Sequence, residues 1–262
     1  MHGRHFFARL FLLTSLLSSL TMANAAQQNV SGIYVDFGAG QAFYANPAAG
    51  NVDVVPDFET DAFGAGKVNH GVFNYQLGTG YQMATKRFWF PLIQAGLLYS
   101  QQLSATVKGH DYLEFQSSDF NNYSYQYSIS TWQLFANVKA DIVDWHGLSP
   151  YVEAGIGVDQ NTANGYASTP KAPVVQPGLA YGNNTTTNFA WRLGLGLDYH
   201  VNKVFTVYAG YQYSGLGNAY LDSAATDSGQ TGRGPGQANL ATNTWLFGFS
   251  YLLGHEHFNH GQ

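Results

Sequence analysis

Apolar and polar residues alternate along most of the chain with a period of two. In the segment 188–201, NFAWRLGLGLDYHV, the series from Phe189 to Val201 is bulky and apolar, while the series from Ala190 to His200 is small, polar or charged. Side chains two positions apart point to the same face of a β-strand, whereas a helix would repeat every three to four residues. The pattern therefore predicts a strand with one bulky apolar face.

Seven further segments alternate in the same way: 32–43, 72–83, 92–107, 132–142, 151–159, 205–214 and 244–253. A tilted membrane strand needs about 9 to 11 residues, and small outer-membrane barrels have an even number of strands. Links after the second, fourth and sixth segments are short, whereas those after the first, third, fifth and seventh run to about 20 residues or more. Short turns at one end and long loops at the other are typical of such barrels. We therefore predict an all-β fold, an eight-stranded antiparallel up-and-down transmembrane β-barrel.

In this barrel both termini and the short turns are periplasmic, and the long loops at 44–70, 108–124, 160–186 and 215–241 are extracellular. Aromatic residues fall near both ends of the strands, as expected at two membrane–water interfaces: Trp132, Trp191 and Trp245 at the loop ends, and Trp89, Trp145, Tyr199, Phe205 and Tyr251 at the turn ends. A soluble β-sandwich or a lipocalin-like barrel is the competing interpretation, because it would turn the bulky series inward. It leaves the difference in loop length unexplained.

The first residues predict export. Arg4 and Arg9 precede a short apolar run, and the small residues Ala23, Asn24 and Ala25 follow it, which is the pattern of a secretory signal peptide. A membrane anchor would need about 20 unbroken apolar residues, more than this run provides. We predict a signal peptide at 1–25, an outer-membrane barrel at 26–253 and a short periplasmic tail at 254–262. The 262-residue chain has no Cys, so no disulfide is expected.

Charge excludes one class of partner. The formal net charge of −5 includes the two leader arginines, so the mature chain is more negative still. Nucleic-acid binding calls for a basic face, and none is expected here. After the leader, no apolar run reaches the length of a membrane helix, so only a barrel would span a membrane.

Three stretches carry a family resemblance: SPYVEAGIGVD, FAWRLGLGLDYHVNKVFTVYAGYQYSGLGN and the final TWLFGFSYLL. They resemble the OmpA-like, opacity-type family of small outer-membrane β-barrels of Gram-negative bacteria. The resemblance implies eight strands, residence in the bacterial outer membrane and surface loops, and it names no substrate. The chain departs from the family pattern in its tail, GHEHFNHGQ, and it lacks the peptidoglycan-binding domain of the larger members.

Charged residues on the small-residue face would point into the lumen. An arginine facing lipid at mid-membrane costs about 2 to 4 kcal/mol, so we expect Arg192 to point inward and to pair with Asp36, Glu153 or Asp198. An eight-stranded barrel is only just wide enough for its own side chains. A packed polar plug is therefore favoured over a gated, narrow ion path. The predicted lumen charge network consists of Asp36, Lys139, Asp141, Glu153, Asp159, Arg192, Asp198 and His200.

The long loops are the large surface left for function. They are rich in Gly, Asn, Ser, Thr and Tyr, a composition typical of adaptable binding surfaces. The contact candidates are Tyr112, Phe115, Phe120, Tyr123 and Tyr125, beside Asp111, Glu114 and Asp119. The first loop carries Asp53, Asp57, Glu59 and Asp61 against Lys67, which favours a basic partner or divalent cations bridging to lipopolysaccharide phosphates. Solvated loops without a dedicated ligand are the alternative.

Catalytic and metal-binding patterns are weak. His70 and the adjacent His110 and Asp111 lie near the predicted extracellular mouth, where a histidine beside a carboxylate is the usual general-base pairing. FGAGKV lacks the first glycine of a phosphate-binding loop, since Asp61 stands there. The tail holds imidazoles suited to Zn²⁺ or Cu²⁺, but without preformed geometry: His255, His257 and His260.

These observations predict a monomeric, non-catalytic barrel without a cofactor. It would contact outer-membrane lipid and lipopolysaccharide, and it would act through its loops, either on a host or matrix ligand or as an envelope structural protein. A narrow ion or small-solute channel is the second hypothesis. An enzyme that modifies lipid A is the third, and it is weakened because the predicted lipid-facing series holds no Ser or His.

Overall fold

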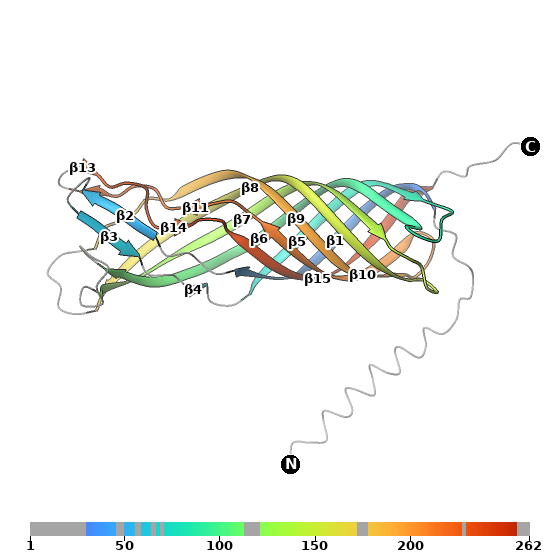
Figure 1. Ribbon diagram of the computed structural model, residues 1–262, viewed down its shortest axis with the longest axis horizontal. Helices are drawn as coiled ribbons and strands as arrows, with labels where there is room; N and C mark the ends of the chain where they lie inside the picture. Colours follow the sequence, from blue (N-terminus) through green and yellow to red (C-terminus); the bar gives the residue numbers. More distant parts are fainter. Residues whose placement is uncertain are drawn as a thin grey trace, which may run out of the picture.

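Eight long antiparallel strands close into a ring in the computed structural model (Figure 1). Each strand pairs with its neighbours in chain order, the first pairs with the last, and the predicted up-and-down barrel is thereby confirmed. The structure describes residues 30–45, 50–55, 59–63, 67–68, 71–112, 121–171, 178–226 and 229–255. The barrel strands are β1 (Gly32–Ala45), β5 (Val72–Ala84), β6 (Leu92–Tyr112), β7 (Asn121–Asp141), β8 (Leu148–Pro170), β9 (Asn184–His200), β10 (Phe205–Gly215) and β15 (Ala241–His255).

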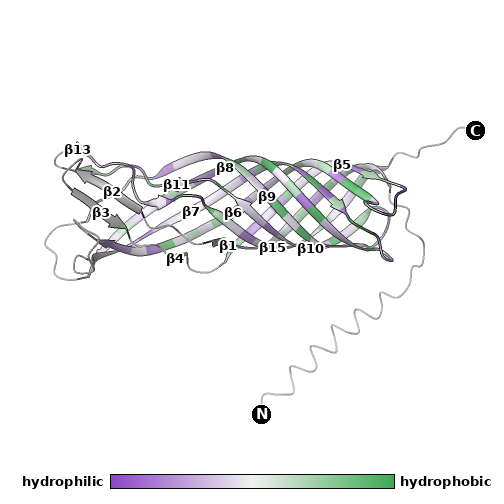
Figure 2. Ribbon diagram, viewed as in Figure 1, coloured by the Kyte–Doolittle hydropathy of each residue, from purple (hydrophilic) through white to green (hydrophobic). Residues whose placement is uncertain are grey.

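Within the apolar band, the bulky series of the strands points outward. Leu195 in β9 is 60% exposed and Phe247 in β15 is 71% exposed, whereas their strand neighbours face the lumen. A continuous apolar outer surface of this kind is what a lipid bilayer covers. Figure 2 shows the hydrophobic colour concentrated on the part of the barrel near the short turns, with paler and more hydrophilic strands beyond it.

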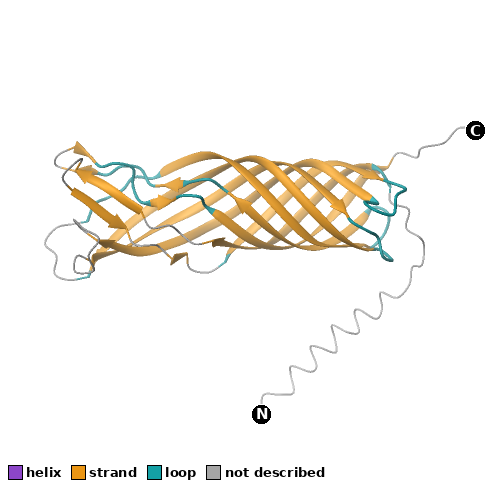
Figure 3. Cartoon of the chain, in the orientation of Figure 1, coloured by secondary structure: helices purple, strands orange, loops and turns teal. Residues whose placement is uncertain are grey.

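One side of the barrel wall is much taller than the other. Strands β6, β7 and β8 have 21, 21 and 23 residues, against 13 in β5 and 11 in β10. The predicted loops 108–124 and 160–186 were therefore too long, because strand continues through much of both (Figure 3). The reason is an inversion of polarity: beyond Trp132, β7 turns Ser128 and Ser130 outward while Tyr127 and Ile129 are buried inside. Because the prediction requires apolar residues on the outward face, it ends the strand at Trp132.

A β-bulge in β6 corrects a second expectation. The pairing of β6 with β7 shifts between Gln102 and Ala105, so the alternation changes sides there. Ala105 and Val107 were expected on the lipid face and are 1% and 0% exposed, while Ser104, expected inside, is exposed. Sequence alternation alone does not reveal where a strand gains an extra residue.

Short strands fill out the loop end of the barrel. The hairpin of β2 (Gly50–Val55) and β3 (Glu59–Phe63) continues the sheet onto β6, and β4 (Lys67–Val68) pairs with β6 below it. Between β10 and β15, β11 (Ala219–Tyr220) pairs with β14 (Gly236–Gln237), and β12 (Ala225–Thr226) pairs with β13 (Gly229–Gln230). The part of the chain described here contains no helix of the length and apolarity needed to cross a membrane.

The predicted terminal segments are only partly covered. The signal peptide at 1–25 lies outside the described residues and stays a prediction. Strand β15 continues to His255, two residues past the predicted end of the barrel at 253. Of the three tail histidines, His257 and His260 lie outside the described residues, and the side chain of His255 is not described.

Candidate functional site

The eight charged residues predicted for the lumen all lie on the inward face of their strands. Seven of the residues are at most 8% exposed, and Asp36 is half-buried. Buried charges are stable only when they are paired and hydrogen-bonded. The question is therefore which partners each of them has.

Arg192 pairs with Glu153, one of the three partners considered from the sequence. Its Nη2 donates to Glu153 Oε1 at 2.8 Å, and its Nη1 lies 3.5 Å from Gln76 Oε1. The guanidinium also lies 5.5 Å from the ring centre of Phe135, a contact that favours a cation. Gly194 makes room for the pair, because a Cβ there would lie 2.4 Å from Glu153 Oε1. Neighbouring strands β8 and β9 thus hold the pair across the sheet.

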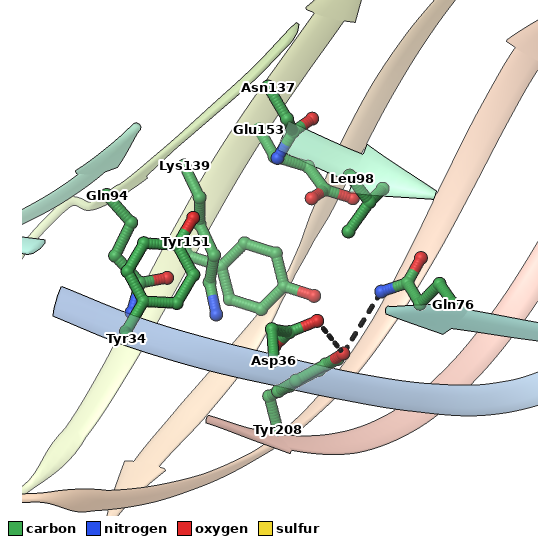
Figure 4. Close-up of a pocket in the computed structure, with 10 residues that line it drawn as sticks. All are labelled: Tyr34, Asp36, Gln76, Gln94, Leu98, Asn137, Lys139, Tyr151, Glu153 and Tyr208. Atoms are coloured by element: carbon green, nitrogen blue, oxygen red, sulfur yellow. Dashed lines mark hydrogen bonds between the residues drawn. The ribbon is translucent and has the colours of Figure 1, made fainter. Parts of the chain in front are cut away.

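Lys139 forms a second ion pair nearer the turn end of the barrel. Its Nζ donates to Asp198 Oδ1 at 2.7 Å and lies 4.1 Å and 4.6 Å from the ring centres of Tyr151 and Tyr208. Tyr208 in turn donates its hydroxyl to Asp36 Oδ1 at 3.0 Å, as Figure 4 shows. Aromatic rings and an aspartate therefore enclose this ammonium group on several sides.

His200 lies between a carboxylate and a hydroxyl at the turn end. Its Nε2 is 2.9 Å from Asp141 Oδ2, and its Nδ1 is 2.9 Å from Thr206 Oγ1. A hydroxyl, an imidazole and a carboxylate in a chain are also the components of nucleophilic catalysis. All three residues are at most 9% exposed, and the lumen cavity described below is lined by none of them. This hydrogen-bonded series of three residues therefore has a structural role: it links the strands on either side of the short turn 201–204.

Asp159 lies apart from these two ion pairs and from His200, near the loop end. Its Oδ2 accepts a 2.6 Å hydrogen bond from the Asn161 amide, and the same amide donates to the backbone oxygen of Leu216 at 2.7 Å. Asn161 Oδ1 accepts from Thr131 at 2.7 Å. This group joins the barrel wall to the β10–β15 connection, so Asp159 belongs to an anchoring site for that connection.

Side chains fill most of the lumen. The cavity drawn in Figure 4 has a volume of about 20 Å³ and is lined by residues that include Asp36, Lys139 and Glu153. About 10 to 15 Å³ is the least that holds one water molecule. This space matches a single water molecule. Seven of the lining residues are not part of the predicted charge network, although their place in the alternation points inward: Tyr34, Gln76, Gln94, Leu98, Asn137, Tyr151 and Tyr208.

A second, apolar core closes the loop end. It brings together Phe63 of β3, residues of β6, β7 and β8, and residues of the β10–β15 connection. Burial raises the pKa of Tyr127 to about 12, partly offset by a hydrogen bond from Gln237, so this hydroxyl stays neutral at physiological pH. The members of this loop-end core are Phe63, Val107, Tyr125, Tyr127, Ile129, Ala163, Tyr181, Leu216, Ala219, Leu221, Ala224 and Leu240.

Two of the residues predicted as loop contacts with a ligand are buried. Tyr123 and Tyr125 are 1% and 5% exposed, so the expectation that they present contact area to a ligand is corrected. They lie on the inward face of β7, where the polarity inversion turns aromatic side chains into the core. Tyr112 ends β6 but its side chain is not described, and Phe115 and Phe120 lie outside the described residues.

The candidate general-base pair is not formed. His110 is exposed and Asp111 is 3% exposed, because consecutive strand residues point to opposite faces. His110 Nδ1 instead lies 2.9 Å from Lys171 Nζ. Among the described residues, no group of three His, Cys, Asp or Glu could hold a metal ion. Other predicted loop residues lie outside the described part or lack described side chains: Asp53, Asp57, Glu59, Asp61, Lys67, His70, Glu114 and Asp119.

Comparison with known proteins gave a family match. A model described as an outer membrane protein beta-barrel domain matches residues 12–252. Comparison with curated proteins gave no match.

Several solved structures are similar. Neisserial surface protein A is 12% identical, with 85% of this chain and 99% of that chain covered and a TM-score of 0.39. Ail, the attachment invasion locus protein of Yersinia pestis, is 14% identical, with 85% and 98% covered and a TM-score of 0.35. OprG from Pseudomonas aeruginosa is 14% identical, with 87% and 98% covered and a TM-score of 0.43. At these identities the likeness concerns the fold alone.

Proposed function

The chain belongs to the outer membrane protein β-barrel family, and on that premise we propose that it is a non-catalytic, non-conducting surface protein that acts through its extracellular end. The short turns of bacterial outer-membrane barrels are periplasmic, so the tall side of the wall rises outside the cell. We call this part the extracellular head. It comprises the parts of β6 to β9 on the extracellular side of Trp132, strands β2 and β3, and residues 216–226 and 229–240.

The filled lumen is the observation that carries the proposal. Two ion pairs and the His200–Asp141 hydrogen bond occupy the bore, and the cavity lined by Lys139 and Glu153 has a volume of about 20 Å³. Above them, Leu216, Leu221 and Leu240 are at most 2% exposed within the loop-end core. A solute would have to displace both a charge network and an apolar core to pass. The filled lumen thus favours a protein that presents a binding surface over a protein that conducts ions.

The extracellular head has an apolar interior, as a folded domain has. Residues of the β10–β15 connection lie against aromatic side chains of β7, and the Asn161 amide fixes the backbone of Leu216. A rigid surface loses less conformational freedom on binding than flexible loops do, which raises affinity. This packing favours a role in surface contact with a host, matrix or envelope ligand.

Two measurements on the same protein test the proposal. Refolded protein in a planar bilayer should show no discrete conductance steps. A variant in which 216–240 is replaced by a short turn should still insert and show heat-modifiable gel migration, but bacteria carrying it should lose attachment to host cells or matrix. Discrete conductance in the intact protein, together with unchanged attachment of the variant, would assign the protein to the narrow-channel alternative.

A further inference from the structure

Three of the four lysine and arginine residues at the loop end of the barrel lie together on the outer face of the tall wall. Lys67 of β4 and Lys108 of β6 are paired positions in the sheet, and Nζ of Lys171, directly after β8, lies 2.9 Å from His110 Nδ1. Lys108, His110 and Lys171 are exposed. The fourth cation of this end is Arg233, in the β10–β15 connection. We call Lys67, Lys108, His110 and Lys171 the basic strip.

The face that carries the basic strip has no acidic residue. In the described parts of β4, β6, β7 and β8 on the loop side of Trp132, the one acidic residue is Asp111, which points inward and is 3% exposed. Paired positions of an antiparallel ladder lie about 4.5 to 5.5 Å apart, and like charges there destabilise the sheet. The pairing of Lys67 with Lys108 therefore has a cost that a bound anion would remove.

The basic strip stands above the membrane. Lys108 is paired with Gln126, which precedes Trp132 by six residues in β7. Six strand residues span about 20 Å, which is about 15 Å along the membrane normal at a strand tilt of about 40°. The headgroup layer on each side of a bilayer is about 5 to 8 Å thick. The phosphates of membrane lipids therefore lie below the strip, and an anion that reaches the strip comes from outside the membrane.

The basic strip is wider than one anionic group. It crosses β4, β6, β7 and β8, which are successive neighbours in the sheet. Neighbouring strands lie about 4.8 Å apart, so the strip extends over about 14 Å. A single phosphate or carboxylate would reach only part of it, whereas a linear polymer with repeated charges would contact all of it.

Polar, uncharged side chains lie between the cations. Strand β7 separates β6 from β8, and it turns Ser124 and Gln126 toward the outside. Hydroxyl and amide groups both donate and accept hydrogen bonds, as sugar hydroxyls do. Cations that flank hydroxyl and amide groups thus match a polymer that carries both anionic groups and hydroxyls.

We propose that the basic strip binds a linear acidic polysaccharide of the host cell surface, with its sulfate or carboxylate groups on the lysines and its hydroxyls on β7. The formal net charge of the chain is −5, so most of the surface repels a polyanion and the strip attracts it. This inference rests on the proposed role of the head in surface contact, and it names the chemical class of the ligand.

Binding of fluorescent heparin oligosaccharides to the full chain in phosphatidylcholine nanodiscs tests the proposal. The double variant Lys108→Gln/Lys171→Gln should weaken binding about tenfold, since each exposed charge contact contributes roughly a factor of three. Its binding should also depend less on salt concentration, because fewer counterions are released. Lys108→Arg/Lys171→Arg keeps the charge and should keep the affinity within about twofold. Heat-modifiable migration verifies that each variant is folded.

The short turn between β5 and β6 provides the matched control. Lys86 and Arg87 are exposed there, at the opposite end of the barrel, and Lys86→Gln/Arg87→Gln makes the same change in net charge. This variant should bind heparin as the unaltered protein does. Equal weakening by both double variants would overturn the proposal. Poly-L-glutamate of equal charge that binds as tightly as heparin would do the same, as would deep-rough lipopolysaccharide that displaces heparin at equal concentration.

Attachment assays separate this inference from the proposed function. If heparin binding is unchanged in Lys108→Gln/Lys171→Gln while replacement of 216–240 abolishes attachment to host cells, the basic strip is not the ligand site and the role of the head stands. If heparin binding requires the strip but neither variant alters attachment, the polysaccharide site stands and the proposed function is wrong.

Discussion

Replacing Arg192 by methionine should destabilise the barrel by about 3 kcal/mol. The substitution keeps an unbranched side chain against Phe135 but removes the partner of Glu153, which is 8% exposed. Removing one member of a buried ion pair typically costs about 3 to 5 kcal/mol, because the other charge stays buried. Lys139 lines the same cavity as Glu153 and would compensate part of this charge, so the low end of the range applies. Such a loss lowers the folding equilibrium constant by about a hundredfold.

A double-mutant cycle isolates the pair. Glu153→Gln alone should also destabilise, since the Arg192 guanidinium would then be buried without its carboxylate. The double variant Arg192→Met/Glu153→Gln should be more stable than the sum of the single effects predicts, by about 2 kcal/mol. Urea unfolding of the refolded protein in lipid vesicles, followed by tryptophan fluorescence and by gel migration without heating, gives the three free energies.

An exposed lysine supplies the control. Lys203 lies in a short turn, and Lys203→Met should change stability by less than about 0.5 kcal/mol. The reasoning is refuted if Arg192→Met is as stable as the unaltered protein. It is also refuted if the single effects add without coupling, because Arg192 and Glu153 would then make no energetically significant pair.

Two further variants test the head and the packing of the lumen. Leu221→Ala, at a site that is 0% exposed, should cost about 2 to 4 kcal/mol and open the head to protease on intact cells, while the barrel keeps its heat-modifiable migration; protection equal to that of the unaltered protein would contradict a packed head. Gly194→Ala should displace Glu153 Oε1 from Arg192 and cost about 1 to 3 kcal/mol in the same urea assay; an unchanged midpoint would show that the site has spare room.

The sequence predicts the membrane part of this fold well because lipid imposes a strict rule. Every second residue of a strand faces hydrocarbon, so bulky apolar side chains recur with a period of two. Leu195 and Phe247 follow this rule and are exposed on the outer face. The same alternation places charged residues such as Arg192 and Asp198 inside, and it does so without any knowledge of their partners.

The rest depends on information that alternation lacks. The choice of Glu153 over Asp36 as the partner of Arg192 follows from strand register, since Glu153 and Gly194 are paired positions on neighbouring strands. The bulge after Gln102 inserts an extra residue and reverses the facing of Val107. Neither the strand register nor a bulge produces a periodic pattern in the sequence, so both become known only from the structure.

Trp132 marks the point where one folding rule replaces another. Below it, hydrocarbon surrounds the wall, so apolar residues face outward and Gln133 and Lys139 face inward; above it, water surrounds the same strand, so Ser130 faces outward and Ile129 is buried. A single strand can obey both rules only if the interior changes from a charge network to an apolar core at the same height. The two interiors therefore meet end to end, with Asn161 bonded to both Asp159 and the backbone of Leu216 at the junction. Because both interiors are packed, the outside of the head is the surface on which the proposed contact with a ligand would take place.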